Sequence, residues 1–405
     1  MSILEELKSQ YDVSIIPYFA ERLEENYDAI IIFDAPVIRR TLLEDIDSHI
    51  QAGRGAVIML DPFQRMNRAN ARLNVKPSAK GKINSIRDLL EHYGLKNSAD
   101  RILGDFKNAA IVETTDGRNF SYPYWLQVRD TNISKDHIVS ANLSELLFAE
   151  AGFFELIDEN LSVDPLITTS TETNLISKKE AQENSTENLA LNFQSKNNKS
   201  GMLAVYLSGV MNSPFKNKSE PNSDSETSVF AIADVDWIYN GFSLADARMG
   251  DRVFSRPIND NHKLFLNMVE YITGDTQLTN VRSRPSPIRT FTSIEAMLLD
   301  SRRMYHERES DYAARIRSTE QSIAEVIKMT GAKNIDNLPA SLREQIRNLQ
   351  LAAHPVRREL REIRSKMRED VIDRFKTLTI VNLLAGPTLA LIVFLFIRRM
   401  RKVQS

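Results

Sequence analysis

Continuous apolar runs alternate with amphipathic segments over the first hundred residues of the chain. Residues 27–36 (YDAIIIFDAP) and 56–62 (AVIMLDP) are two such runs, and apolar positions recur at helical spacing between them, over residues 37–52. Strands that are apolar on both faces and joined by a helix are typical of a buried parallel sheet made of βαβ units. A second amphipathic helix is predicted over residues 83–93, where Gly94 ends it. The pattern therefore predicts that an α/β domain begins here.

Strand-like runs return at residues 202–209 (MLAVYLSG) and 228–237 (SVFAIADVDW), and a helix is predicted over residues 261–273. We therefore expect the α/β domain to cover residues 1–275. Two polar stretches interrupt it, at residues 168–200 and 212–225. Because these stretches lack the apolar content that packing needs, we expect them to be disordered insertions; the alternative is that they are functional loops.

The pattern changes beyond residue 275. Residues 276–290 are expected to form a linker, and residues 291–376 read as long charged helices that a turn at residues 330–337 divides. The apolar positions of the second helix follow the alternating four-three spacing of a coiled-coil seam: Leu342, Ile346, Leu349, Ala353, Val356, Leu360, Ile363 and Met367. The spacing predicts a coiled-coil-like helical hairpin, with a kink at Pro355.

The end of this hairpin is rich in charge. Residues 357–376 carry eight Lys or Arg against five Asp or Glu. We interpret them as solvated flanks of the seam that pair at helical spacing, as Arg358 can with Glu362. A weak contact of the last turns with phospholipid headgroups is the alternative.

Residues 377–397 form an uncharged stretch that precedes a basic tail, residues 398–405. As a helix this stretch would be roughly 30 Å long, which matches the hydrocarbon core of a bilayer. We therefore predict one transmembrane helix, with the basic tail in the cytoplasm and the α/β domain outside. Residues 1–14 lack the apolar and basic regions of a signal peptide. We expect the chain to be part of a longer exported protein; the alternative is a tail-anchored protein whose globular part is cytosolic.

Charge and composition narrow the possible chemistry. The formal net charge of -2 gives no general attraction to nucleic acid, and the absence of cysteine excludes disulfides, thiolate catalysis and cysteine-ligated metals. The sequence contains no GxxxxGK[ST] phosphate loop, no HExxH metal motif and no GxSxG nucleophile motif. We therefore predict no cofactor and no catalytic or metal-binding residues.

Three carboxylates are the candidates for a ligand-binding site: Asp61, Asp234 and Asp236. Asp61 follows a predicted strand, and the other two would point to the same side of an extended segment. Ligands of open α/β sheets gather beyond the carboxyl ends of the strands. Acidic residues also end strands for a structural reason, because they cap the following turn or helix, and this second interpretation stays open.

The order of several short segments resembles a known family, the auxiliary, gliding-motility-associated components of bacterial ABC transporters. The segments that carry the resemblance are YDAIIIFDAPVI, AGRGAVIMLDPF, PLITTS, MLAVYLSGVMNSPF, FAIADVDWIYNGFS, LPASLREQI and RRELREIRSKMRED. They cover most of the chain, although each is short.

The resemblance implies a Rossmann-like domain similar to class I glutamine amidotransferases, without their activity, because their nucleophile is a cysteine. It also implies a position at the bacterial inner membrane, facing the periplasm, beside an ABC ATPase and a multi-span permease. The substrate held there would be a protein, a lipid-linked molecule or a polysaccharide.

The chain departs from the family pattern at its N-terminus, where a membrane segment and a further domain are usual, and at Asn240, where an acidic residue is common. The alternative function is a membrane-anchored hydrolase or glycan-processing enzyme that uses the strand-end carboxylates.

Overall fold

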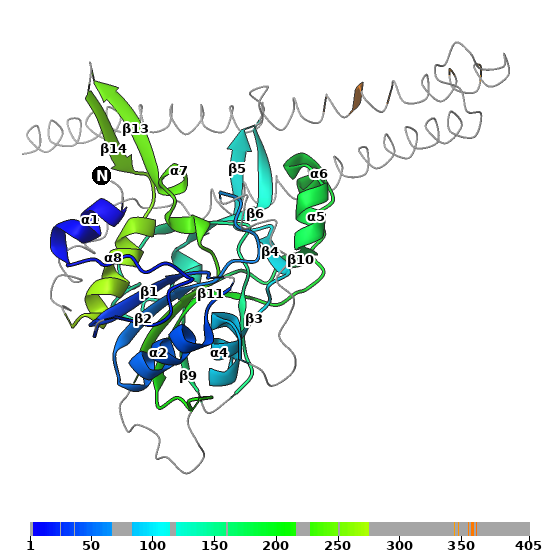
Figure 1. Cartoon of the computed structure of the whole chain (residues 1–405). Coiled ribbons are helices and arrows are strands. Elements are labelled where there is room, and N and C mark those ends of the chain that lie inside the picture. Colours follow the sequence, from blue (N-terminus) through cyan, green and yellow to red (C-terminus); the bar gives the residue numbers. More distant parts are fainter. Residues whose placement is uncertain are drawn as a thin grey trace, which may run out of the picture. The chain divides into compact units, whose positions relative to one another are not determined.

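The computed structural model describes residues 3–274, apart from 25, 36, 67–82, 114–118, 159–160, 216–226 and 250–251, and six single residues between 344 and 362. The chain divides into two units, residues 1–287 and 288–405. The helices and strands that follow belong to the first unit (Figure 1).

A seven-stranded mixed sheet forms the centre of the first unit. Strands β1 (Ala29–Phe33), β2 (Gly55–Met59) and β12 (Thr227–Ile232) are parallel neighbours. The remaining strands pair antiparallel. Strand β11 (Met202–Gly209) pairs with β12, and both β8 (Phe154–Leu156) and β9 (Ser162–Thr168) pair with β11. Strand β3 (Leu95–Asn97) pairs with β8. The predicted α/β class and the first βαβ unit are confirmed, but the prediction of a parallel sheet holds only for the first three strands. The likeness to amidotransferases stays a prediction.

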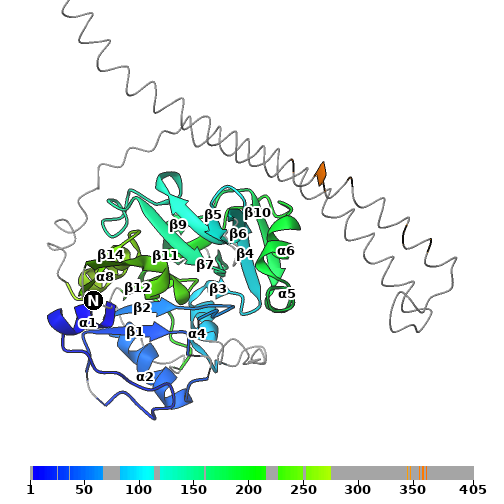
Figure 2. The same cartoon turned by 90° about the horizontal axis from the view of Figure 1, so that it is seen from above.

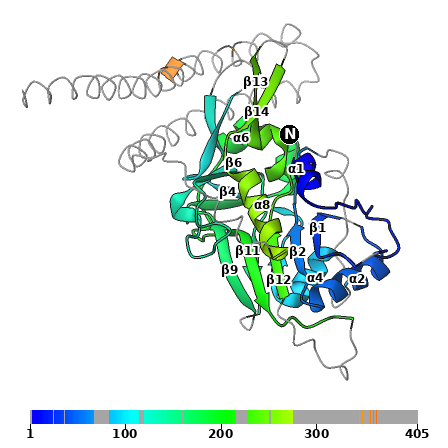
Figure 3. The same cartoon turned by 90° about the vertical axis from the view of Figure 1, so that its left-hand side faces the viewer.

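Helices cover both faces of this sheet (Figures 2 and 3). On one face, α2 (Arg40–Gln51) and α4 (Ile86–Tyr93) bury leucines and isoleucines in one apolar cluster with residues of the central sheet. On the other face, α1 (Ile3–Gln10) and α8 (Asn261–Ile272) pack against a second apolar cluster. The sequence sets the ends of α4, because the Ser85 side chain accepts the Asp88 N–H at its start and Gly94 adopts φ 106° after its end.

Smaller sheets lie beside the central one. Strand β4 (Arg101–Asp105) pairs with β10 (Thr173–Ser177), while β5 (Ala109–Glu113), β6 (Asn119–Arg129) and β7 (Glu145–Ala149) form a three-stranded sheet. The 3₁₀ turns η1 (Asp130–Asn132) and η2 (Asp236–Ile238) and helix α7 (Asn240–Ser243) connect elements. A hairpin of β13 (Leu244–Met249) and β14 (Arg252–Pro257) projects on the same side as the β5–β6 hairpin (Figure 1).

The polar stretch at residues 168–200 is ordered, contrary to the expectation of a disordered insertion. It contains β10 and two short helices, α5 (Lys178–Glu183) and α6 (Thr186–Leu191). Some of its polar residues act as caps, since the side chain of Ser177 accepts the Glu180 N–H and the Glu180 carboxylate accepts the Ser177 N–H. Its few apolar side chains, such as Phe193, are buried. Composition alone therefore could not predict the helix caps or the buried positions of this stretch. Most of the other polar stretch, residues 216–225, lies outside the described residues.

In the second unit the described residues are Glu344, Arg347, Pro355, Arg358, Glu359 and Glu362, and all of them are helical and exposed. Arg358 Nε lies 3.1 Å from Glu362 Oε1, which confirms the predicted pair at helical spacing. The predicted coiled-coil seam and the predicted membrane helix at residues 377–397 lie outside the described residues. Among the residues that are described, no helix has the length and apolar character needed to cross a membrane.

Candidate site at the carboxyl edge of the sheet

The three parallel strands of the central sheet each end in an aspartate. Asp34 follows β1 directly, and Asp61 and Asp234 come two residues after β2 and β12. Phe33 and Ile232 are both in register with Met59, so the three strands end at the same level. The fold therefore gathers three carboxylates from distant parts of the sequence at one edge of the sheet.

Asp61 is buried, with 4% of its surface exposed, and it holds two loops together. Its Oδ1 accepts the Phe63 N–H at 2.7 Å, and its Oδ2 accepts the Val235 N–H at 3.2 Å. Burial raises the pKa of Asp61 well above its ordinary value, and the nearby charge of Asp236 raises it further. Asp61 is therefore harder to ionise than an exposed aspartate, although its two backbone hydrogen bonds act in the opposite direction.

Asp234 is completely buried and binds backbone N–H groups at the start of the turn η2. Its Oδ1 accepts the N–H groups of Asp236 at 2.7 Å and Trp237 at 3.2 Å, and its Oδ2 accepts the Ala149 N–H at 2.7 Å. Burial raises its pKa strongly, followed by the charges of Asp61 and Asp236. Asp234 thus fixes the chain after β12 against the end of β7.

Asp236 lies within the turn η2, and its Oδ2 accepts the Met66 N–H at 3.1 Å. Burial raises the pKa of Asp236 to about 6. The sequence predicted that Asp234 and Asp236 share one side of an extended segment, and this is wrong because β12 ends at Ile232. The structure nevertheless brings both carboxylates near Asp61, through the turn instead of through strand alternation.

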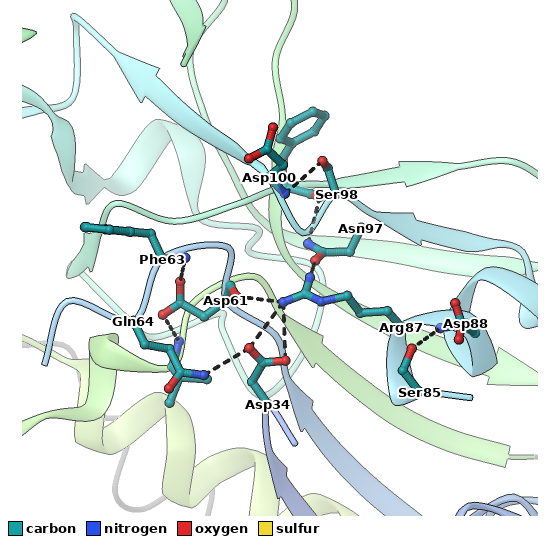
Figure 4. Close-up of polar contacts among 12 residues, drawn as sticks. Asp34, Asp61, Phe63, Gln64, Ser85, Arg87, Asp88, Asn97, Ser98 and Asp100 are labelled. Atoms are coloured by element: carbon teal, nitrogen blue, oxygen red, sulfur yellow. Dashed lines mark hydrogen bonds and ion pairs between the residues drawn. The ribbon is translucent and has the colours of Figure 1, made fainter. Parts of the chain in front are cut away.

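Sequence reasoning missed a second set of residues at this edge (Figure 4). Arg87 points from α4 toward the strand ends, where its Nη2 contacts both carboxylate oxygens of Asp34 at 3.3 Å and donates to the Asp61 carbonyl at 2.7 Å. Its Nη1 donates to Asn97 Oδ1, and Gln64 Nε2 donates to Asp34 Oδ2 at 3.0 Å. Asp34 could have been predicted, because it follows an apolar run as Asp61 does. Arg87 gave no sequence signal, since it looks like any charged residue of an amphipathic helix.

No group of three or more His, Cys, Asp or Glu residues within the described part of the chain has the arrangement of a metal site. The aspartates at the carboxyl edge are instead surrounded by backbone N–H groups and by the guanidinium of Arg87. The hydrogen bonds therefore support the capping interpretation for Asp61 and Asp234, which accept N–H groups of the residues that follow them. Asp236 instead accepts an N–H from another loop, that of Met66.

The family model described as an ABC-type uncharacterized transport system matches residues 1–268. The chain belongs to this family. The match confirms the suspected auxiliary component of an ABC transport system, and it includes every residue of the carboxyl edge. No curated protein matches the chain significantly.

This ABC transport component also has a buried ion pair next to the carboxyl edge, between Arg65 and Glu150, which the sequence did not predict. Glu150 is completely buried and adopts φ 56°, which is uncommon for a residue other than glycine. Arg65 donates to it through two nitrogens, with Nε 2.5 Å from Oε2, and the Tyr122 hydroxyl donates to Oε1 at 2.6 Å. The Arg65 guanidinium also lies over the Phe63 ring, 5.4 Å from its centroid. The loop after β2 is thus fixed from both sides, by Glu150 and by Asp236.

Proposed function

We propose that the chain is a non-catalytic, membrane-anchored accessory subunit of an ABC-type transport complex, of the kind associated with gliding motility. Other chains would supply the ATPase and the multi-span permease. In this assignment the α/β domain binds substrate outside the membrane, and the helical hairpin spaces it from the permease. Membership of the ABC transport family supports the general role.

The non-catalytic assignment rests on one observation, that the strand-end carboxylates already bind backbone N–H groups. A general acid or base must reach the substrate with a free oxygen. Asp61 and Asp234 are almost inaccessible to solvent, and each of their four oxygens already accepts a backbone N–H. These groups stabilise the loops around the carboxyl edge. This favours binding over the alternative of an anchored hydrolase.

The anchored arrangement rests on residues 377–405. An uncharged stretch long enough to span a bilayer, followed by a basic tail, favours a cytoplasmic C-terminus and an α/β domain on the outer side. Contact of the hairpin's last turns with anionic lipid would add to the anchoring.

Cysteine labelling in intact cells tests this topology, because the chain has no cysteine of its own. Single cysteines are placed at Ser200, which is exposed, and at Ser405 in the tail. A cysteine at Ala231, which is buried in β12, serves as the inaccessible control. A membrane-impermeant maleimide is expected to label position 200, and to label position 405 only after permeabilisation. Labelling of position 405 alone in intact cells would show the opposite topology and refute the proposal.

A further inference from the structure

Asn240 and Gly241 form the exposed half of helix α7. Both residues are exposed to solvent, whereas Phe242 and Ser243, which complete the helix, are buried. The chain contains no other asparagine that is followed by glycine. In such a pair the backbone nitrogen of the glycine can attack the asparagine side chain, because glycine has no Cβ that hinders the approach.

Both groups that would react lack hydrogen bonds to the described part of the chain. No described residue binds the Asn240 carboxamide, and the Gly241 N–H donates to no described atom. An unpaired N–H is usual in the first turn of a helix. The N–H groups that follow differ, because Phe242 donates to the Tyr239 carbonyl at 2.9 Å and Leu244 donates to the Asn240 carbonyl. The carboxamide carbon and the Gly241 nitrogen are therefore not held by other partners.

Helix α7 restrains the Asn240 backbone only weakly. It is a single turn of four residues, and one helix bond, from the Leu244 N–H, ends on the Asn240 carbonyl. A single turn has little stability of its own. The attack needs the Asn240 backbone to rotate out of the helical conformation, and this local opening breaks that one bond.

The packing of Tyr239 favours a glycine after Asn240. A Cβ at position 241 would lie 2.8 Å from Cε1 of Tyr239, so the tyrosine ring lies across the glycine. Any other residue at position 241 would have to displace this ring. The fold therefore places the residue type that permits the attack directly after an exposed asparagine.

We propose that Asn240 is a site of spontaneous deamidation. The Gly241 nitrogen bonds to Cγ of Asn240, the side-chain nitrogen leaves as ammonia together with the former Gly241 amide proton, and a five-membered succinimide forms. Water then opens the succinimide at one of its two carbonyls, which gives aspartate or isoaspartate at position 240. The inference goes beyond the proposed function and does not depend on it.

Either product adds one negative charge beside the carboxyl edge. The Tyr239 N–H donates to the Asp236 carbonyl at 2.9 Å, so position 240 directly follows the turn that contains Asp236. Isoaspartate also lengthens the backbone by one methylene group within α7. Molecules of the chain therefore become more acidic at this place as they age.

Peptide mapping by mass spectrometry tests the proposal on the purified full chain in mild detergent, incubated at neutral and at mildly alkaline pH. Asn198 is the internal control, because it is also exposed and no described residue binds its carboxamide, but Lys199 follows it. Conversion at position 240 is expected to be about tenfold faster than at position 198, because lysine has a Cβ. It should also accelerate with pH, because the attacking nitrogen must lose its proton. Methylation by an isoaspartyl methyltransferase measures the isoaspartate fraction.

Two variants and an unfolded sample complete the test. Asn240→Gln should abolish conversion at position 240, since its longer side chain would need a six-membered ring, and Gly241→Ala should slow it. The chain unfolded in guanidinium gives the rate without α7. Faster conversion at position 240 than at position 198 in the folded chain supports the proposal. Equal rates at the two positions overturn it, and so does conversion that occurs in the unfolded chain alone.

Discussion

Replacement of Asp236 by Asn should change how the stability of the α/β unit depends on pH. Burial raises the pKa of Asp236 from its ordinary 3.8 to about 6. The folded state therefore binds the proton more tightly than the unfolded state, and stability falls as pH rises from about 4 through about 6. At about 1.4 kcal/mol per pKa unit, ionisation costs the folded state up to about 3 kcal/mol. Asp236→Asn removes this loss and keeps one oxygen for the Met66 N–H.

Guanidinium unfolding followed by tryptophan fluorescence measures the effect, because both tryptophans, Trp125 and Trp237, lie in this unit. The free energy of unfolding of Asp236→Asn, minus that of the unmodified chain, should increase by about 3 kcal/mol between pH 4 and pH 8. Glu24→Gln, which removes an exposed carboxylate, controls for the change in net charge. A difference that stays constant across this range would refute the assignment of a raised pKa to Asp236.

Three further outcomes are expected. Arg65→Met leaves the Glu150 carboxylate buried without its partner and should lower the free energy of unfolding by about 3 kcal/mol. Adding Glu150→Gln to this variant should recover part of the loss, which a double-mutant cycle measures. Gly104→Ala should cost about 1–3 kcal/mol in the same unfolding assay, because its Cβ would lie 2.5 Å from Tyr124 Cε1. Replacing all three candidate aspartates by asparagine, in a folded variant, should leave transport intact; loss of transport with normal folding would favour the hydrolase alternative.

The parts of the fold that the sequence predicted are those set by local pattern. The run of isoleucines in β1 and the apolar run of β2 marked a βαβ unit, and Gly94 marked the end of α4, whereas the predicted start at residue 83 lies before the N-cap Ser85. The antiparallel half of the sheet could not be predicted in the same way. Apolar runs such as residues 202–209 show that a strand is buried, but they do not show its direction or its neighbour.

The candidate site was predicted only in part, for a similar reason. Asp61 was found because it ends an apolar run, and Asp234 because it lies in the run of residues 228–237; the fold brings both carboxylates to one edge of the sheet, and their part in ligand binding stays a prediction. Arg87 reaches the same edge from helix α4, and Glu150 lies next to it in the loop after β7. Contacts between residues so far apart in sequence arise from the packing of the whole unit, so a single sequence gives no sign of them.

The central claim is that the chain acts as a subunit of an ABC transport complex. The most direct test is to extract the tagged full chain from its native membrane in mild detergent and to identify co-purifying proteins by mass spectrometry. An unrelated single-span membrane protein with the same tag serves as the control. Our account predicts specific enrichment of an ATPase that carries a GxxxxGK[ST] phosphate loop, together with a multi-span permease. Recovery of neither protein above the control would contradict the account.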